Sequence, residues 1–104
     1  MLLNDYQDLA SKYIVPTATG EERVFGLLEE AGEVAGIFKR LLRGDYAYNE
    51  ASARLFKELG DVLWYLSQIA KDNNWTLQEV AEGNLEKLES RLIRNQIIGE
   101  GDNR

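Results

Sequence analysis

Hydrophobic residues recur along the chain at helical spacing, and no segment shows the alternation of a strand. The clearest stripe follows Thr19 and continues, with apolar residues three and four positions apart, to Leu42. That spacing predicts an amphipathic helix. Thr19-Gly20-Glu21-Glu22 also has the sequence of a capping box, in which the Thr side chain accepts a bond from a first-turn amide. We therefore predict a long helix from about residue 19 to 42.

Three further helices are predicted on the same grounds. One covers about residues 2–14 and ends before Val15-Pro16, because a residue that precedes proline avoids the α region. Another covers about residues 49–71. The last begins at a second capping-box sequence, which starts with Thr76, and its apolar stripe continues to Leu92.

The predicted fold class is all-α: one domain over residues 1–104, resembling a four-helix bundle. Residues from about 96 to 104 are expected to be irregular, either disordered or folded over a neighbouring subunit. The apolar stripes are wide enough to leave apolar surface on a monomer, so we expect a homodimer or homotetramer. Gly32 and Gly36 lie on one side of their helix, where either they let another helix approach closely or the helix simply tolerates them.

The absence of histidine and cysteine excludes more functions than any other count. It removes Ser-His-Asp and Cys-His catalysis, the usual zinc sites, and di-iron centres built on Glu-x-x-His pairs. A formal net charge of −6 argues against a nucleic acid polymer as partner, since that requires basic patches. Single nucleotides remain open, because a cation can meet their phosphates.

No apolar run approaches the roughly 20 residues of a membrane span. The first residues have neither the basic region nor the long apolar region of a signal peptide. Together with the absence of cysteine, these features favour a cytoplasmic protein with no membrane partner.

Two acidic pairs lie on the second and third predicted helices. Glu30 and Glu33 form Glu-x-x-Glu, and Glu58 and Asp61 form Glu-x-x-Asp. Residues three apart share a helix face, and the first acid of each pair borders its apolar stripe. If the two helices pack antiparallel through these stripes, the four carboxylates can converge.

Converging carboxylates repel one another in a partly desolvated place unless a cation neutralises them. Oxygen ligands without histidine or cysteine select Mg²⁺, Mn²⁺ or Ca²⁺, and Mg²⁺ leaves positions for water and substrate phosphates. This combination suggests phosphate-ester or phosphoanhydride chemistry. The alternative for either pair alone is a solvated helix face, because 18 of the 104 residues are acidic.

The segments LLEEAGEVAGIFKR and KELGDVLWYL together resemble the MazG-like all-α NTP pyrophosphatases. Their signature is E-x-x-E, a spacer, and E-x-x-D. Here residues 34–57, 24 in all, separate Glu33 from Glu58, and a glycine precedes the last acid of each pair. The resemblance continues through NLEKLESR to the terminal GEGDNR, so it covers the chain from about Tyr6 onward.

The resemblance implies hydrolysis of nucleoside or deoxynucleoside triphosphates between the α- and β-phosphates, which releases a monophosphate and pyrophosphate. Such an activity clears unwanted or excess nucleotides. By motif, the catalytic residues that hold Mg²⁺, or Mn²⁺ in its place, are Glu30, Glu33, Glu58 and Asp61. One of them can double as the general base, and the sequence leaves open which. Glu29 is either an outer neighbour of the metal or simply exposed.

Similar proteins place an aromatic side chain beside the nucleotide where this chain has Tyr65, four residues after Asp61. Packing between helices is the alternative for Tyr65, and Trp64 is interpreted as a packing or interface residue. Lys39 follows the first acidic pair, together with Arg40 and Arg43. These cations can contact phosphate, or they can simply complement the dipole at a helix C-terminus.

Asn84, Lys87 and Arg91 follow one ridge of the fourth predicted helix. Asn can recognise a base or sugar edge, while Lys and Arg can hold phosphate oxygens. The family has a similar Asn-x-x-Lys feature, which favours contact with the nucleotide. Two other interpretations remain: a helical module that binds nucleotides without cleaving them, and a structural oligomer with solvated carboxylates. The complete set of four acids favours the enzyme.

Overall fold

Four α-helices and no strand make up the structure, a computed structural model that describes residues 1–104. The helices are α1 (Leu3–Ala10), α2 (Gly20–Leu42), α3 (Tyr48–Asp72) and α4 (Leu77–Ile93). This confirms the expected all-α class, and the bounds of α2, α3 and α4 agree with the expected ones to within a residue or so. None of the helices combines the length and the apolar character needed to cross a membrane.

The first helix is shorter than the sequence suggested. It ends at Ala10 and continues as a 3-10 turn over Ser11–Tyr13. The Ser11 hydroxyl donates to the carbonyl of Gln7 at 2.8 Å, and such bonds back to the preceding turn bend and weaken a helix. Ile14 is then extended, with φ −69° and ψ 129°. The prediction of one helix over residues 2–14 was therefore too long.

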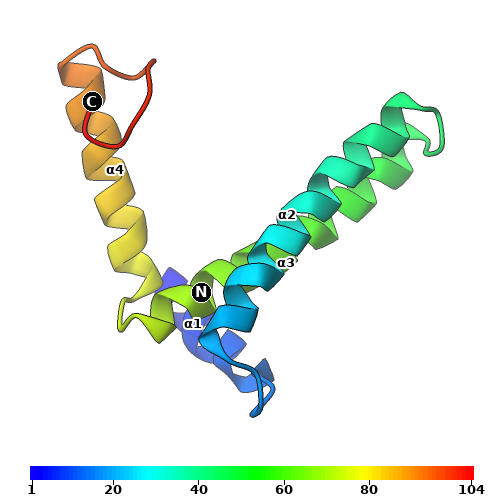
Figure 1. Cartoon of the computed structure of the whole chain (residues 1–104), viewed down its shortest axis with the longest axis horizontal. Coiled ribbons are helices and arrows are strands. Elements are labelled where there is room, and N and C mark those ends of the chain that lie inside the picture. Colours follow the sequence, from blue (N-terminus) through cyan, green and yellow to red (C-terminus); the bar gives the residue numbers. More distant parts are fainter.

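α2 and α3 form an antiparallel hairpin (Figure 1). The hydroxyl of Thr19 accepts a bond from the amide of Glu22 at 3.2 Å, as the capping sequence predicted. At the open end of the hairpin, the Arg23 guanidinium donates to both carboxylate oxygens of Asp72, at 2.6 and 2.7 Å. This bidentate pair fixes the start of α2 against the end of α3 and so helps to set the register of the hairpin.

A buried polar network joins α1, α3 and α4. The side-chain amide of Gln7 donates to the carbonyls of Ser67 at 3.0 Å and Trp75 at 3.1 Å, and its oxygen accepts from the amide of Leu77 at 2.9 Å. Ser67 and Gln68 are fully buried beside it. Because the Leu77 amide is in the first turn of α4 and lacks a partner within that helix, this bond fixes where α4 begins.

The helices do not close into a compact bundle within one chain. In Figure 1, α4 starts at the junction with α1 and α3 and then leads away from the α2–α3 hairpin. Only nine of the 104 residues are buried, so most of each apolar stripe stays exposed, including Leu28, Phe56, Leu85 and Leu92. The bundle-like packing expected from the sequence is thus limited to the hairpin and the junction, because most of α4 has no partner helix.

Gly32 and Gly36 have no close helix neighbour in this chain. A Cβ atom added at Gly32 would meet nothing within 4 Å, and one at Gly36 would meet only the side chain of Arg40. The expected close approach of another helix therefore does not occur within a single copy of the chain.

Candidate active site

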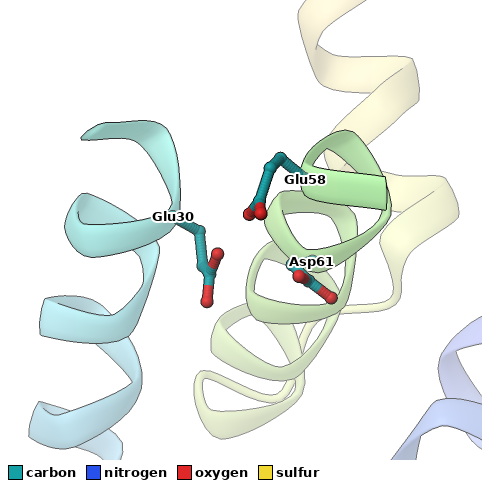
Figure 2. A group of neighbouring side chains, drawn as sticks. All are labelled: Glu30, Glu58 and Asp61. Atoms are coloured by element: carbon teal, nitrogen blue, oxygen red, sulfur yellow. The ribbon is translucent and has the colours of Figure 1, made fainter. Parts of the chain in front are cut away.

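Three carboxylates converge across the hairpin. Figure 2 shows Glu30, on α2, facing Glu58 and Asp61, on α3. One carboxylate oxygen from each residue lies within 4.8 Å of the other two, with Glu30 and Glu58 partly buried and Asp61 exposed. The convergence follows from the sequence, because Glu58 and Asp61 share a face of α3 and the antiparallel packing places Glu30 opposite them. We call these three residues the acidic cluster.

The acidic cluster has no positive partner, since none of its carboxylates takes part in an ion pair. One oxygen of Glu58, Oε2, is buried without any hydrogen-bond partner. The pKa of Glu30 is raised from 4.5 to about 7, chiefly through hydrogen bonding to Glu58, then through burial and the neighbouring negative charges, Asp61 first. The cluster is therefore unfavourable when fully ionised, unless a cation joins it.

Glu33 is not part of the acidic cluster. It lies about one turn further along α2, is exposed, and lines a cavity of about 370 Å³ together with Glu58. Three of the four carboxylates predicted from the sequence thus meet at one point, and the fourth lies beside the cavity that opens next to them.

The same cavity is also lined by cations that the sequence reasoning largely missed. Arg40, Arg54 and Lys57 line it, together with Tyr46. The Arg54 guanidinium lies over the Tyr46 ring, 4.5 Å from its centroid, and donates to Oε1 of Glu50, which also lines the cavity, at 3.0 and 3.3 Å. Arg54 comes four residues before Glu58, so helical spacing places it on the same face of α3, although spacing does not distinguish it from other surface cations.

Lys39 does not line this cavity. It is an exposed residue in the last part of α2, whereas its neighbour Arg40 turns into the cavity. Arg43 instead forms an exposed ion pair with Asp45 at 3.5 Å. Among the three cations that follow the first acidic pair, Arg40 is the one that lies next to the carboxylates.

Tyr65 packs between the two helices of the hairpin. Its ring lies so close to Gly26 that a Cβ atom added there would overlap it. It also stands edge-on to Trp64, with ring centroids 5.0 Å apart and an interplanar angle of 89°. The Trp64 indole donates to the carbonyl of Ala10 at 3.0 Å, which attaches α1 to α3. Within this chain both aromatic side chains serve packing, as one of the two interpretations of Tyr65 anticipated.

We call Asn84, Lys87 and Arg91 the α4 ridge. Within one chain this ridge does not reach the acidic cluster, because α4 leads away from the hairpin (Figure 1). Asn84 is exposed on it. Lys87 and Arg91 both contact the carboxylate of Asp102, at 3.1 and 3.4 Å. The cations of the ridge are therefore occupied by the C-terminal residues of the same chain.

Comparison with known proteins defines the family. Residues 19–93 match the MazG nucleotide pyrophosphohydrolase domain, and that range contains the acidic cluster, Glu33 and the α4 ridge. The chain is also 44% identical over 81 residues to the Gene 37 protein of Mycobacterium phage L5, a match that covers 76% of this chain and 71% of that protein. No solved structure matches the chain. The chain belongs to the MazG nucleotide pyrophosphohydrolase family, as its acidic motifs predicted.

Proposed function

We propose that the protein hydrolyses nucleoside or deoxynucleoside triphosphates at the α–β phosphoanhydride in a Mg²⁺-dependent reaction. Water adds to phosphorus, the bridging P–O bond breaks, and the products are a nucleoside monophosphate and pyrophosphate. The observation that carries this proposal is the acidic cluster: three carboxylates within 4.8 Å of one another, on two helices, without a cationic partner. Membership of the MazG nucleotide pyrophosphohydrolase family supports this reaction type.

The donor atoms of the cluster suit a hard divalent cation. Glu30, Glu58 and Asp61 offer only oxygen, which Mg²⁺ and Mn²⁺ prefer, and the unpartnered buried oxygen of Glu58 gives such an ion a ready ligand. Glu33 can contribute from the neighbouring turn of α2. When bound, the metal would neutralise the triphosphate and polarise the phosphorus that is attacked.

The triphosphate is proposed to extend from the acidic cluster into the adjoining cavity. Arg40, Arg54 and Lys57 line that cavity, which also contains Glu33 and Glu58. Arg can donate two parallel hydrogen bonds to a phosphate, whereas Lys acts as a point charge. A lining that mixes carboxylates and cations is suited to a metal-bound polyphosphate and unsuited to a neutral ligand, and the phosphate would compete with Glu50 for Arg54.

We also propose that the active form is a homodimer or homotetramer. Large apolar side chains are exposed along α2, α3 and α4, and patches of this kind on a small protein mark an interaction surface. In such an assembly, the ridge of Asn84, Lys87 and Arg91 would meet nucleotide bound at the hairpin of a second copy. Tyr65 and Lys39 would be contacts of secondary importance, because Tyr65 is occupied in packing and Lys39 lies outside the cavity.

A pyrophosphate-release assay over standard and modified NTPs and dNTPs, with Mg²⁺ and with a chelator, tests the proposal. We expect metal-dependent release of pyrophosphate, with the monophosphate as the other product. Release of inorganic phosphate and a diphosphate would instead indicate cleavage at the β–γ bond. The absence of turnover across the whole panel, with folded protein and Mg²⁺ or Mn²⁺ present, would overturn the proposal. Preference for modified or non-standard bases would support a house-cleaning role.

A further inference from the structure

The last residues of the chain, 96–104, form an ordered loop folded back on α4. Arg104 closes this loop: its guanidinium donates to the carbonyls of Gln96, Ile97 and Gly101 at 3.1, 3.0 and 2.6 Å. Gly99 and Gly101 have φ values of 148° and 82°, which non-glycine residues rarely adopt. Two glycines at special backbone angles and a cation that bonds three carbonyls indicate a built conformation. We call residues 96–104 the C-terminal loop.

The C-terminal loop places one carboxylate on the two cations of the α4 ridge. Asp102 Oδ1 accepts from Lys87 Nζ at 3.1 Å and from Arg91 Nη2 at 3.4 Å. Arg91 Nη2 also donates to the main-chain carbonyls of Gly101 and Asp102, at 3.4 and 3.0 Å. As a result the Arg91 side chain is only 6% exposed, and its Nε is buried without a partner.

The pKa of Asp102 is lowered chiefly by the hydrogen bond from Lys87. The positive charge of Lys87 and the hydrogen bond from Arg91 lower it further. The carboxylate is thus ionised over the neutral pH range. One negatively charged group that bridges a Lys and an Arg four residues apart is the contact that a phosphate would make with the same two side chains.

We propose that Asp102 occupies the position of a substrate phosphate on Lys87 and Arg91, so that the C-terminal loop is an autoinhibitory segment which nucleotide has to displace. This inference rests on the proposed function, since it takes Lys87 and Arg91 as substrate contacts. Arg91 cannot reach a phosphate while the loop covers it. Release of the loop therefore precedes, or accompanies, engagement of nucleotide by the α4 ridge.

The contact is weak enough to be displaced. Asp102 is 84% exposed, and ion pairs in that environment contribute little to stability and are screened by salt. A triphosphate brings several negative charges to the same two cations and, with a divalent ion, has a second attachment at the acidic cluster. Removing the competing carboxylate should therefore raise the apparent affinity for substrate about three- to tenfold, the range that weak ion pairs allow.

The decisive comparison is Asp102→Asn against Glu100→Gln. Both remove one negative charge from the C-terminal loop, but only Asp102 contacts Lys87 and Arg91. For Asp102→Asn we expect a KM that is about three- to tenfold lower, with kcat little changed, and for Glu100→Gln a KM close to that of the wild type. A higher KM in Asp102→Asn would mean that the loop positions Arg91 for substrate, and equal effects in both variants would mean a general charge effect. Either result overturns the proposal.

A second measurement does not depend on turnover. Inorganic tripolyphosphate has the phosphate chain of the triphosphate without base or sugar, and it can be added to the 104-residue chain while the backbone amides of residues 99–103 are followed by NMR. We expect these signals to move to random-coil positions as tripolyphosphate is added in the presence of Mg²⁺. Unchanged loop signals at saturating tripolyphosphate would overturn the inference. Loop release in a protein that releases no pyrophosphate would instead count against the proposed catalytic function alone.

Discussion

The acidic cluster and the two cations of the α4 ridge are both groups of like charge, but only the cations have a counter-ion within the chain. The carboxylates of Glu30, Glu58 and Asp61 face one another without a cation. On the ridge, Lys87 and Arg91 share the carboxylate of Asp102. The first cluster lacks a counter-ion and is expected to respond to metal and pH. The second already has one, so any ligand there must compete, and its response is expected to follow salt and polyanions.

The largest effect is expected from removing one charge of the acidic cluster. Asp61→Asn or Glu58→Gln should lower kcat by more than about 100-fold, because mutation of even an indirect partner of a metal ligand commonly costs 10- to 100-fold. Circular dichroism should show an intact fold, since Asp61 is exposed and neither residue is in an ion pair. The control is Glu21→Gln, an exposed acid at the start of α2. Turnover close to that of wild type in both cluster variants would remove the cluster from the mechanism.

The close packing that holds the acidic cluster together can be tested at Gly26. A methyl group there would overlap the Tyr65 ring, one turn of α2 before Glu30, so Gly26→Ala should destabilise the protein by about 1–3 kcal/mol. Gly32→Ala is the matched control in the same helix, because a Cβ there meets nothing, and it should stabilise by up to about 1 kcal/mol. Urea denaturation of both variants measures the difference.

The change in stability caused by Gly32→Ala also reports on self-association. A gain in stability means that this face of α2 is free in the assembled protein as well as in one chain. A loss, accompanied by weaker self-association, would place a helix of a second copy against Gly32. Equal effects at Gly26 and Gly32 would contradict the close contact between Tyr65 and α2.

A smaller effect is expected on the free energy of unfolding, which should depend on pH and on Mg²⁺. Folding raises the pKa of Glu30 from 4.5 to about 7, so between these values the folded protein retains a proton that the unfolded chain releases. Without metal, the free energy of unfolding should therefore fall as pH rises through this window and stay low above it. Mg²⁺ competes with that proton, so thermal stabilisation by Mg²⁺ should be small near pH 6 and larger near pH 8.

The size of this effect can be estimated from mass action. A metal concentration about ten times the Kd contributes about 1.4 kcal/mol, which corresponds to several degrees in Tm for a chain of this length. Glu30→Gln should remove both the pH dependence and most of the response to Mg²⁺, and it should stabilise the metal-free protein near pH 8. A Tm that rises with Mg²⁺ equally at both pH values, or in Glu30→Gln, would contradict a cation held by this cluster.

The sequence predicts the acidic cluster well because its geometry is local. Spacing of three residues places Glu58 and Asp61 on one face, and a short connection between amphipathic helices requires antiparallel packing. The same reasoning could not predict that Glu33 lies outside the acidic cluster, because its position relative to the other three carboxylates depends on how far the two helices are offset. Arg54 was within reach of the same spacing rule, but nothing in the pattern distinguishes it from other surface cations.

The direction of α4 and the fold of the C-terminal loop were beyond sequence reasoning. The direction depends on the junction of Gln7, Ser67 and Gln68, polar residues that an apolar periodicity analysis passes over. The loop depends on contacts of Asp102 with Lys87 and Arg91, which come from residues many positions apart and carry no local signature. In contrast, the exposed apolar stripes were anticipated, because four helices in a chain of 104 residues offer too little partner surface to bury them.

The junction at Gln7 sets the orientation of α4, and a small change in that orientation moves the far end of the helix a long way. Its 17 residues extend about 25 Å from the point at which the Gln7 oxygen accepts from the Leu77 amide. A rotation of α4 by about 10° about this hydrogen bond moves the C-terminal end of the helix by about 4 Å, more than the length of a hydrogen bond. Hydrogen bonds fix such an angle more narrowly than apolar contacts can, because they tolerate little misalignment. A side chain that touches neither Lys87 nor Arg91 thus governs how far these two cations can reach.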